Sequence, residues 1–212
     1  MNSVFVICEI DDAKIADVSL ELLTKGRSLA NRLKCKLEAV VLGSELDGIE
    51  KELFPYGADV VHIGDDPRLK PYTTLPHAAV INGLFREEKP QIGLLGATTM
   101  GRDLGPRVSS ALGSGLTADC TALEIGDHEE KKANMVYKDL LYQIRPAFGG
   151  NIVATIINPD HRPQMATVRE GVMKKEIFSA SHKGVVKKID VSKYLKPEDL
   201  VVKVLERHME KN

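Results

Sequence analysis

The sequence contains only three cysteines, and their number and spacing suit neither a disulfide framework nor a metal centre. An odd number cannot pair completely, and Cys8, Cys35 and Cys120 each stand inside an apolar segment, as reduced core residues do. The six histidines are scattered without a repeated ligand spacing, so we predict no metal site. These features favour a reducing compartment, and we expect the protein to be cytoplasmic.

The chain also lacks an excess of one charge and a long apolar run. Its 29 Lys and Arg residues balance 30 Asp and Glu residues, whereas nucleic-acid-binding proteins usually present a clustered basic face. No apolar segment approaches the roughly 18 residues of a membrane-spanning helix. The first residues do not resemble a signal peptide. We therefore expect no nucleic-acid partner and no membrane span.

What the sequence does contain is a regular alternation of short apolar segments with amphipathic ones. The expected strands span residues 4–10, 37–42, 60–63, 92–95 and 120–125, and the expected helices span residues 18–33, 49–54, 75–88 and 104–112. Such alternation predicts an α/β fold with an open, mostly parallel sheet and helices on both of its faces.

The C-terminal third of the chain has a different pattern. From Gly126 onward the strand-like segments are separated by connections too short for crossover helices; they span residues 135–144, 152–157, 165–168 and 184–189. This spacing predicts a small antiparallel extension of the sheet. Residues 199–212 fit either a strand or a helix. We expect residues 1–190 to form one domain and residues 191–212 to form a tail or linker.

The first candidate site is the segment GATTMGRDLGPR at residues 96–107, which follows an apolar strand and opens a helix. Its polar side chains are Thr98, Thr99, Arg102 and Asp103. Loops of this kind form ligand sites at the carboxyl edge of an α/β sheet. The segment matches neither the dinucleotide-binding pattern G-x-G-x-x-G nor a Walker A loop. A structural interpretation is equally open, in which Asp103 caps the helix and Arg102 is solvated.

The second candidate site is the segment RPAFGGN at residues 145–151. Arg145 is a cation in an otherwise uncharged segment, and a guanidinium there can hydrogen-bond or stack on a planar ring. Gly149, Gly150 and Asn151 allow a flat ligand or another chain to approach the backbone closely. A salt bridge or simple solvent exposure is the alternative for Arg145. A third polar group, in MATVREG at residues 165–171, fits a surface turn better than a site.

Three segments together resemble the N-terminal domain of the electron transfer flavoprotein alpha subunit, in the form found in electron-bifurcating members. They are GATTMGRDLGPRVSSALGSGLTADC, RPAFGGNIVATI and RPQMATVREGVM, at residues 96–120, 145–156 and 162–173, and the resemblance covers nearly the whole chain. It implies a Rossmann-like domain that pairs with a beta subunit of similar fold. Family alpha subunits continue after a linker into an FAD-binding domain, which this sequence lacks, so either the sequence is part of a longer subunit or the protein has no flavin of its own.

The resemblance also implies roles for the candidate residues. In members that bifurcate electrons from NADH, a flavin of the beta subunit faces this domain, and Arg145 would lie near its ring and tune its potential. Phe148, Gly149, Gly150 and Asn151 would shape the same face. Thr98, Thr99, Arg102 and Asp103 would face either the FAD-binding domain or the subunit interface.

The function that follows is an electron carrier subunit rather than a self-contained enzyme. The domain would cover the FAD of a beta subunit and take part in electron transfer to or from an acyl-CoA dehydrogenase-type flavoenzyme, with NAD and ferredoxin as further candidates. Two alternatives stay open: a stand-alone adenine-nucleotide-binding domain and a purely structural docking domain.

Overall fold

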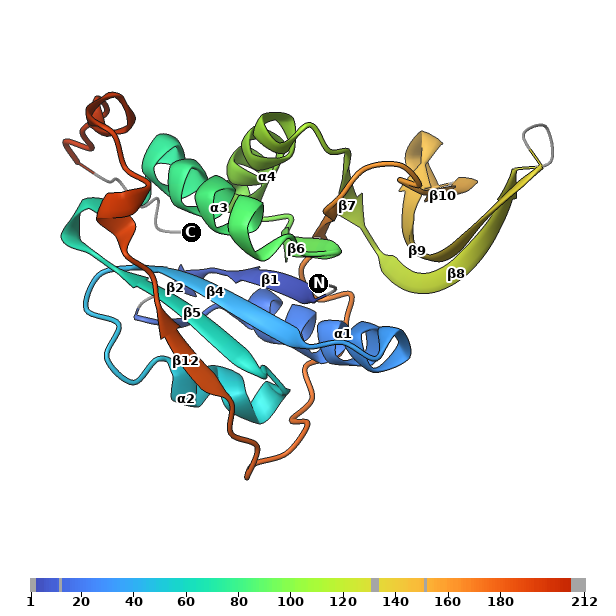
Figure 1. The fold of residues 1–212 in the computed structure, drawn as a ribbon, viewed down its shortest axis with the longest axis horizontal. Coiled ribbons are helices and arrows are strands. Elements are labelled where there is room, and N and C mark those ends of the chain that lie inside the picture. Colours follow the sequence, from blue (N-terminus) through green and yellow to red (C-terminus); the bar gives the residue numbers. More distant parts are fainter. Residues whose placement is uncertain (1–2, 12, 131–133, 151, 207–212) are drawn as a thin grey trace.

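A seven-stranded parallel sheet forms the centre of the molecule in the computed structural model, which describes residues 3–11, 13–130, 134–150 and 152–206 (Figure 1). The strand order is β12-β5-β4-β1-β6-β11-β7. In chain order these strands are β1 Val4–Cys8, β4 Leu37–Gly43, β5 Val60–Asp65, β6 Ile92–Gly96, β7 Leu116–Cys120, β11 Gln164–Val168 and β12 Val185–Lys188. All five residues of β1 are buried, as expected of a parallel strand that is covered on both faces.

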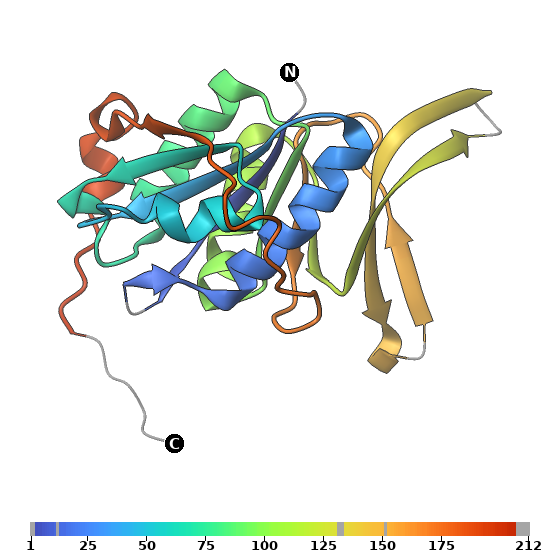
Figure 2. The ribbon, with the colours of Figure 1, turned by 90° about the horizontal axis from the view of Figure 1, so that it is seen from below.

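Helices cover the two faces of this sheet. Helices α1, Asp17–Leu33, and α2, Glu50–Leu53, lie on one face, and helices α3, Thr74–Glu88, and α4, Thr99–Leu112, lie on the other (Figures 1 and 2). The apolar core accordingly has two parts. Leu22 and Leu23 of α1 pack with one set of strand side chains, and Ile81 and Phe85 of α3 pack with the other.

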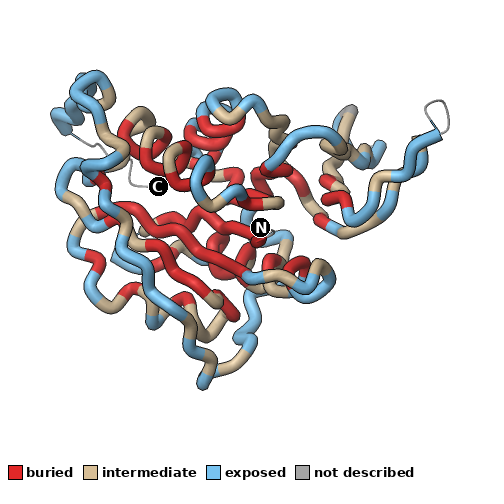
Figure 3. Tube along the Cα trace, viewed as in Figure 1, coloured by how far each residue is buried: buried red, intermediate tan, exposed pale blue. Residues whose placement is uncertain are grey.

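A three-stranded antiparallel sheet projects beyond β7. It has the order β10-β9-β8, with β8 at Ala122–Glu130, β9 at Met135–Ala147 and β10 at Ile152–Ile156. At its base, next to the parallel sheet, the buried side chains are Leu123, Leu140 and Leu141, whereas its far end is exposed (Figure 3). Short elements complete the chain: β2 Ile10–Asp11, β3 Lys14–Ile15, and the 3-10 turns Phe54–Tyr56, Pro67–Leu69, Phe148–Gly150, Val191–Lys193 and Pro197–Leu200.

The sequence-based prediction of a mostly parallel sheet with helices on both faces and a small antiparallel extension is confirmed. Three details differ. The strand predicted at residues 120–125 crosses the boundary between β7 and β8, because the chain turns at Thr121. Strands β11 and β12 join the parallel sheet rather than the antiparallel one. The antiparallel sheet connects β7 to β11, and an extended segment connects β11 to β12. Residues 201–206 form neither strand nor helix.

No helix among the described residues is long and apolar enough to cross a membrane.

Candidate functional site

The first candidate loop joins β6 to α4, and the polar groups of Thr98 in this loop bond to other groups of the protein. Thr98 is the N-cap of α4, and its hydroxyl oxygen accepts a hydrogen bond from the Gly101 amide at 2.9 Å. The same hydroxyl donates to the carboxylate of Glu9, whose oxygens lie 2.7 and 2.8 Å away. A Cβ atom at Gly101 would stand 1.8 Å from the Gly96 carbonyl oxygen, so this turn requires glycine.

Glu9 occupies a position where related α/β folds bind anions. It follows β1, beside the point where the strand order reverses between β1 and β6, and it lies next to the N-terminus of α4. Only 8% of Glu9 is exposed, and burial, together with the nearby Glu170 and Asp11, raises the pKa of its carboxyl group while the Thr98 hydrogen bond opposes that shift. A carboxylate already fills the site that a phosphate would need.

The prediction that Asp103 caps α4 is wrong. Asp103 lies in the second turn of the helix, and its Oδ2 accepts hydrogen bonds from the Tyr72 hydroxyl at 2.7 Å and the Thr74 hydroxyl at 2.5 Å. These bonds join α4 to the start of α3. Burial and the Asp103 carboxylate raise the pKa of Tyr72. Thr99, the first residue of α4, is exposed.

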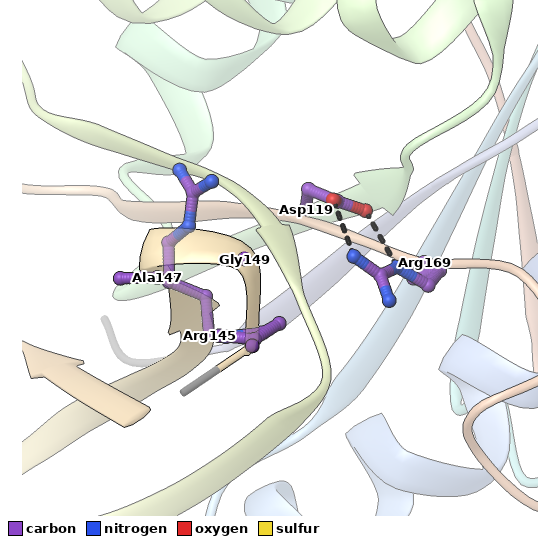
Figure 4. Close-up of a pocket in the computed structure, with 7 residues that line it drawn as sticks. Asp119, Arg145, Ala147, Gly149 and Arg169 are labelled. Carbon is purple, nitrogen blue, oxygen red and sulfur yellow. Dashed lines mark hydrogen bonds and ion pairs between the residues drawn. The ribbon is translucent and has the colours of Figure 1, made fainter. Parts of the chain in front are cut away.

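A different aspartate, Asp119 near the end of β7, pairs with two arginines, Arg169 and Arg102. Its carboxylate accepts two hydrogen bonds from Arg169, from Nε at 3.1 Å and from Nη2 at 2.8 Å (Figure 4). Nη2 of Arg102 lies 3.7 Å from its Oδ1. Arg169 is the main cause that holds the pKa of Asp119 below its usual value, and Arg102 and Arg145 add to the effect. Asp119 therefore connects the first candidate loop to the segment after β11.

The second candidate segment lines a cavity of about 460 Å³ beside this cluster. The lining residues are Asp119, Arg145, Pro146, Ala147, Gly149, Gly150 and Arg169. Gly149 and Gly150 have φ angles of 68° and 90°, and a Cβ atom on either would meet nothing within 4 Å. The backbone of this turn is therefore open to a neighbouring group.

Arg145 itself has no hydrogen-bond or ion-pair partner among the residues that the structure describes. In Figure 4 its side chain rises from β9 beside the cavity, and no bond joins it to the Asp119 and Arg169 pair. It is a half-buried cation at an open wall of the molecule. The side chain of Phe148, and Asn151 as a whole, lie outside the described residues.

The structure thus separates the predicted residues into two groups. Arg102 and Arg145 come together with Arg169 around Asp119. Thr98 instead bonds to Glu9, which follows β1, and Asp103 bonds to the start of α3, away from the cavity lining. The surface-turn interpretation of MATVREG was incomplete, because Thr167 and Arg169 both bond to Asp119. Sequence reasoning missed Asp119 as well; the signal was an acidic residue close to the end of a strand, inside the first motif segment.

In the part of the chain that the structure describes, no group of three or more His, Cys, Asp or Glu residues is arranged to hold a metal ion.

Comparisons with known proteins give one family. The model of the electron transfer flavoprotein domain matches residues 4–194. The electron transfer flavoprotein subunit alpha of Thermoanaerobacterium thermosaccharolyticum is 42% identical over 204 residues, which cover 96% of this chain and 58% of that protein. The acryloyl-CoA reductase electron transfer subunit beta of Anaerotignum propionicum is 41% identical over 217 residues, covering 96% of this chain and 59% of that protein.

A more distant relative is the lactate dehydrogenase (NAD(+),ferredoxin) subunit LctC of Acetobacterium woodii. It is 37% identical over 187 residues, which cover 86% of this chain and 41% of that protein. The chain therefore spans between two fifths and three fifths of the length of these relatives.

Proposed function

The chain belongs to the electron transfer flavoprotein domain family, and we propose that it is the alpha-type half of a heterodimer, covering the FAD of a beta-type subunit during electron transfer. The observation that carries this proposal is Arg145. It is a half-buried cation beside an open cavity and has no partner among the described residues. A cation in such a position suits a negatively charged or planar group supplied from outside the domain.

The residues of this cavity fit one face of a flavin ring. The glycine turn leaves open space above its backbone, and the arginines provide positive charge without a closed pocket. FAD, when bound by the partner, supplies the one- and two-electron chemistry. Arg145 would stabilise negative charge on the reduced ring and so raise its reduction potential. The domain is then an electron carrier subunit and not a self-contained enzyme.

The identity of the redox partners rests on the names of relatives. One relative is an acryloyl-CoA reductase electron transfer subunit, which supports an acyl-CoA dehydrogenase-type flavoenzyme as electron donor or acceptor. Another relative carries NAD(+) and ferredoxin in its name, which supports an NADH-linked, bifurcating role in which both take part.

The alternative of a stand-alone adenine-nucleotide-binding domain has a physical obstacle. Glu9 places a carboxylate next to the N-terminus of α4, where a nucleotide phosphate would have to bind, and like charges repel there. We therefore give Thr98, Thr99, Arg102 and Asp103 an interface role rather than a nucleotide-binding one.

The test is co-expression of this chain with a beta-type subunit of the family, followed by an absorption spectrum and an FAD count for the purified complex. We expect a yellow heterodimer, and no flavin or adenine nucleotide on the chain purified alone. Arg145→Ala should assemble normally and shift the midpoint potential of the flavin to a more negative value, with Arg145→Lys in between. A complex without flavin, or a potential unchanged by Arg145→Ala, contradicts the assignment.

A further inference from the structure

We propose that Asp119 is a positioning residue for this surface: it holds Arg169 to the side of the cavity, leaves Arg145 as the outward cation, and lowers the positive charge that a bound flavin meets. This inference rests on the proposed function for its redox consequence. Its geometric part concerns this chain alone.

The backbone at Asp119 is specialised for its task. Its φ angle is +61°, in the left-handed region that non-glycine residues seldom adopt, although aspartate and asparagine tolerate it better than most. The Asp119 amide donates to the Thr167 hydroxyl at 2.9 Å, and the register between β7 and β11 shifts at this point. The bulge re-aims the side chain toward the arginines, a common use of bulges near functional sites.

Fold stability alone gives little reason for this arrangement. The Arg169 and Arg102 side chains are 47% and 62% exposed, and ion pairs in contact with water contribute little to stability. The left-handed backbone at Asp119 has a steric cost, and the ion pair with Arg169 that it allows has only a small stabilising effect. The arrangement is better explained by what the three arginines do at the cavity.

The charges around the cavity give the direction of the effect. Two arginines, Arg102 and Arg169, pair with the carboxylate of Asp119, and the charge of Arg145 acts on the same carboxylate without a bond to it. Removing the Asp119 charge makes the cavity more positive, and it also weakens the bidentate pairing that fixes Arg169, because an asparagine keeps only one of the two acceptor oxygens. A more positive cavity favours negative charge on the reduced ring, so the midpoint potential should rise. Loss of Arg145 should lower it.

The decisive variant is Asp119→Asn, because asparagine also tolerates the left-handed backbone and has nearly the same shape. Asp47→Asn is the matched control. It removes the same charge from an exposed loop residue outside the cavity lining, where the effect on the flavin potential should be far smaller. In the heterodimer with a beta-type subunit, we expect Asp119→Asn to retain FAD at the wild-type ratio. Its flavin potential should shift to a more positive value, opposite in sign to the shift in Arg145→Ala, whereas Asp47→Asn should match the wild type.

A second measurement separates this inference from the proposed function. In the chain without a partner, the Nε–H group of Arg169 should give a protected ¹⁵N NMR signal, and Asp119→Ala, which removes both acceptor oxygens, should abolish that protection. If the complex holds no flavin, the proposed function fails, and the NMR experiment still tests the positioning. A protected Arg169 signal in Asp119→Ala overturns the positioning role, and an unshifted flavin potential in Asp119→Asn overturns the electrostatic one.

Discussion

The Thr98 hydroxyl donates to the buried carboxylate of Glu9 at 2.7 Å and thereby joins the start of α4 to the residue that follows β1. The bond lies at the position where the strand order reverses, which in α/β folds is the usual place for a ligand. Here a side chain of the protein takes that place, and the open cationic surface lies elsewhere, around Asp119 and Arg145.

Glu9→Gln should stabilise the protein at neutral pH. Burial raises the pKa of Glu9 in the folded state, so folding favours the neutral carboxyl group. The stability that Glu9 contributes is therefore fully present below the unfolded pKa, and the protein loses it as the pH rises through the folded pKa. Glutamine stays neutral and still accepts the Thr98 hydrogen bond. Urea unfolding from pH 4 to 8 should show the variant above the wild type at pH 8, with the difference closing toward pH 4. Equal stability at pH 8 would count against a buried, penalised carboxylate, and the exposed Glu198→Gln is the control.

His77 should give a pH dependence of the opposite sign. The imidazole is buried and bonds to the Thr73 carbonyl, and burial lowers the pKa of His77 to about 4. Folding therefore disfavours its charged form, so stability present above the unfolded pKa is lost as the pH falls from about 6.5 to about 4, by up to roughly 3 kcal/mol. Titration of the His77 ring signals by NMR should give a midpoint well below 6. A midpoint near 6.5 would contradict the prediction.

Gly101→Ala should be strongly destabilising. The new Cβ atom would meet the Gly96 carbonyl oxygen at 1.8 Å, and the junction between β6 and α4 would have to open at a cost of about 3 kcal/mol or more. Gly113→Ala, at the C-terminal end of the same helix, is the comparison. It has a positive φ angle but open space, so it should cost only about 1 kcal/mol. Chemical denaturation of both variants should reproduce this order, and equal losses would refute the steric account.

Arg145→Ala should leave the stability of the chain almost unchanged. No described residue bonds to Arg145, so the free energy of unfolding should change by less than about 0.5 kcal/mol. Arg27→Ala provides the contrast, because Arg27 is largely buried and bonds to Asp59 at 2.7 Å and to the Gly57 carbonyl oxygen at 3.1 Å. That loss should cost about 2 kcal/mol. A large loss in Arg145→Ala would mean that the residue supports the fold.

Local patterns were sufficient for most of the fold. The fully apolar segment at β6 predicts a strand, because a strand covered on both faces needs apolar residues throughout. The amphipathic segment at α1 predicts a helix, because a helix covered on one face needs apolar residues on that face only. Arg145 is a candidate from the sequence because it is a cation among uncharged neighbours, and its role at a flavin stays a prediction. The cap of α4 was misread because Asp103 and Thr98 are both good capping residues, and only the backbone course decides which one is used.

By itself, then, the sequence determined the alternation of strands and helices, the family, and the candidate arginine, all of which depend on near neighbours in the chain. Only the tertiary structure decided that β11 inserts between β6 and β7, which brings Arg169 to Asp119, that Arg102 pairs with the same carboxylate, and that Arg145 lies at the cavity beside it without a bond to it. Those contacts join residues far apart in sequence, and they follow from strand order and from one bulge. No local pattern encodes either of these, because both depend on how distant segments pack.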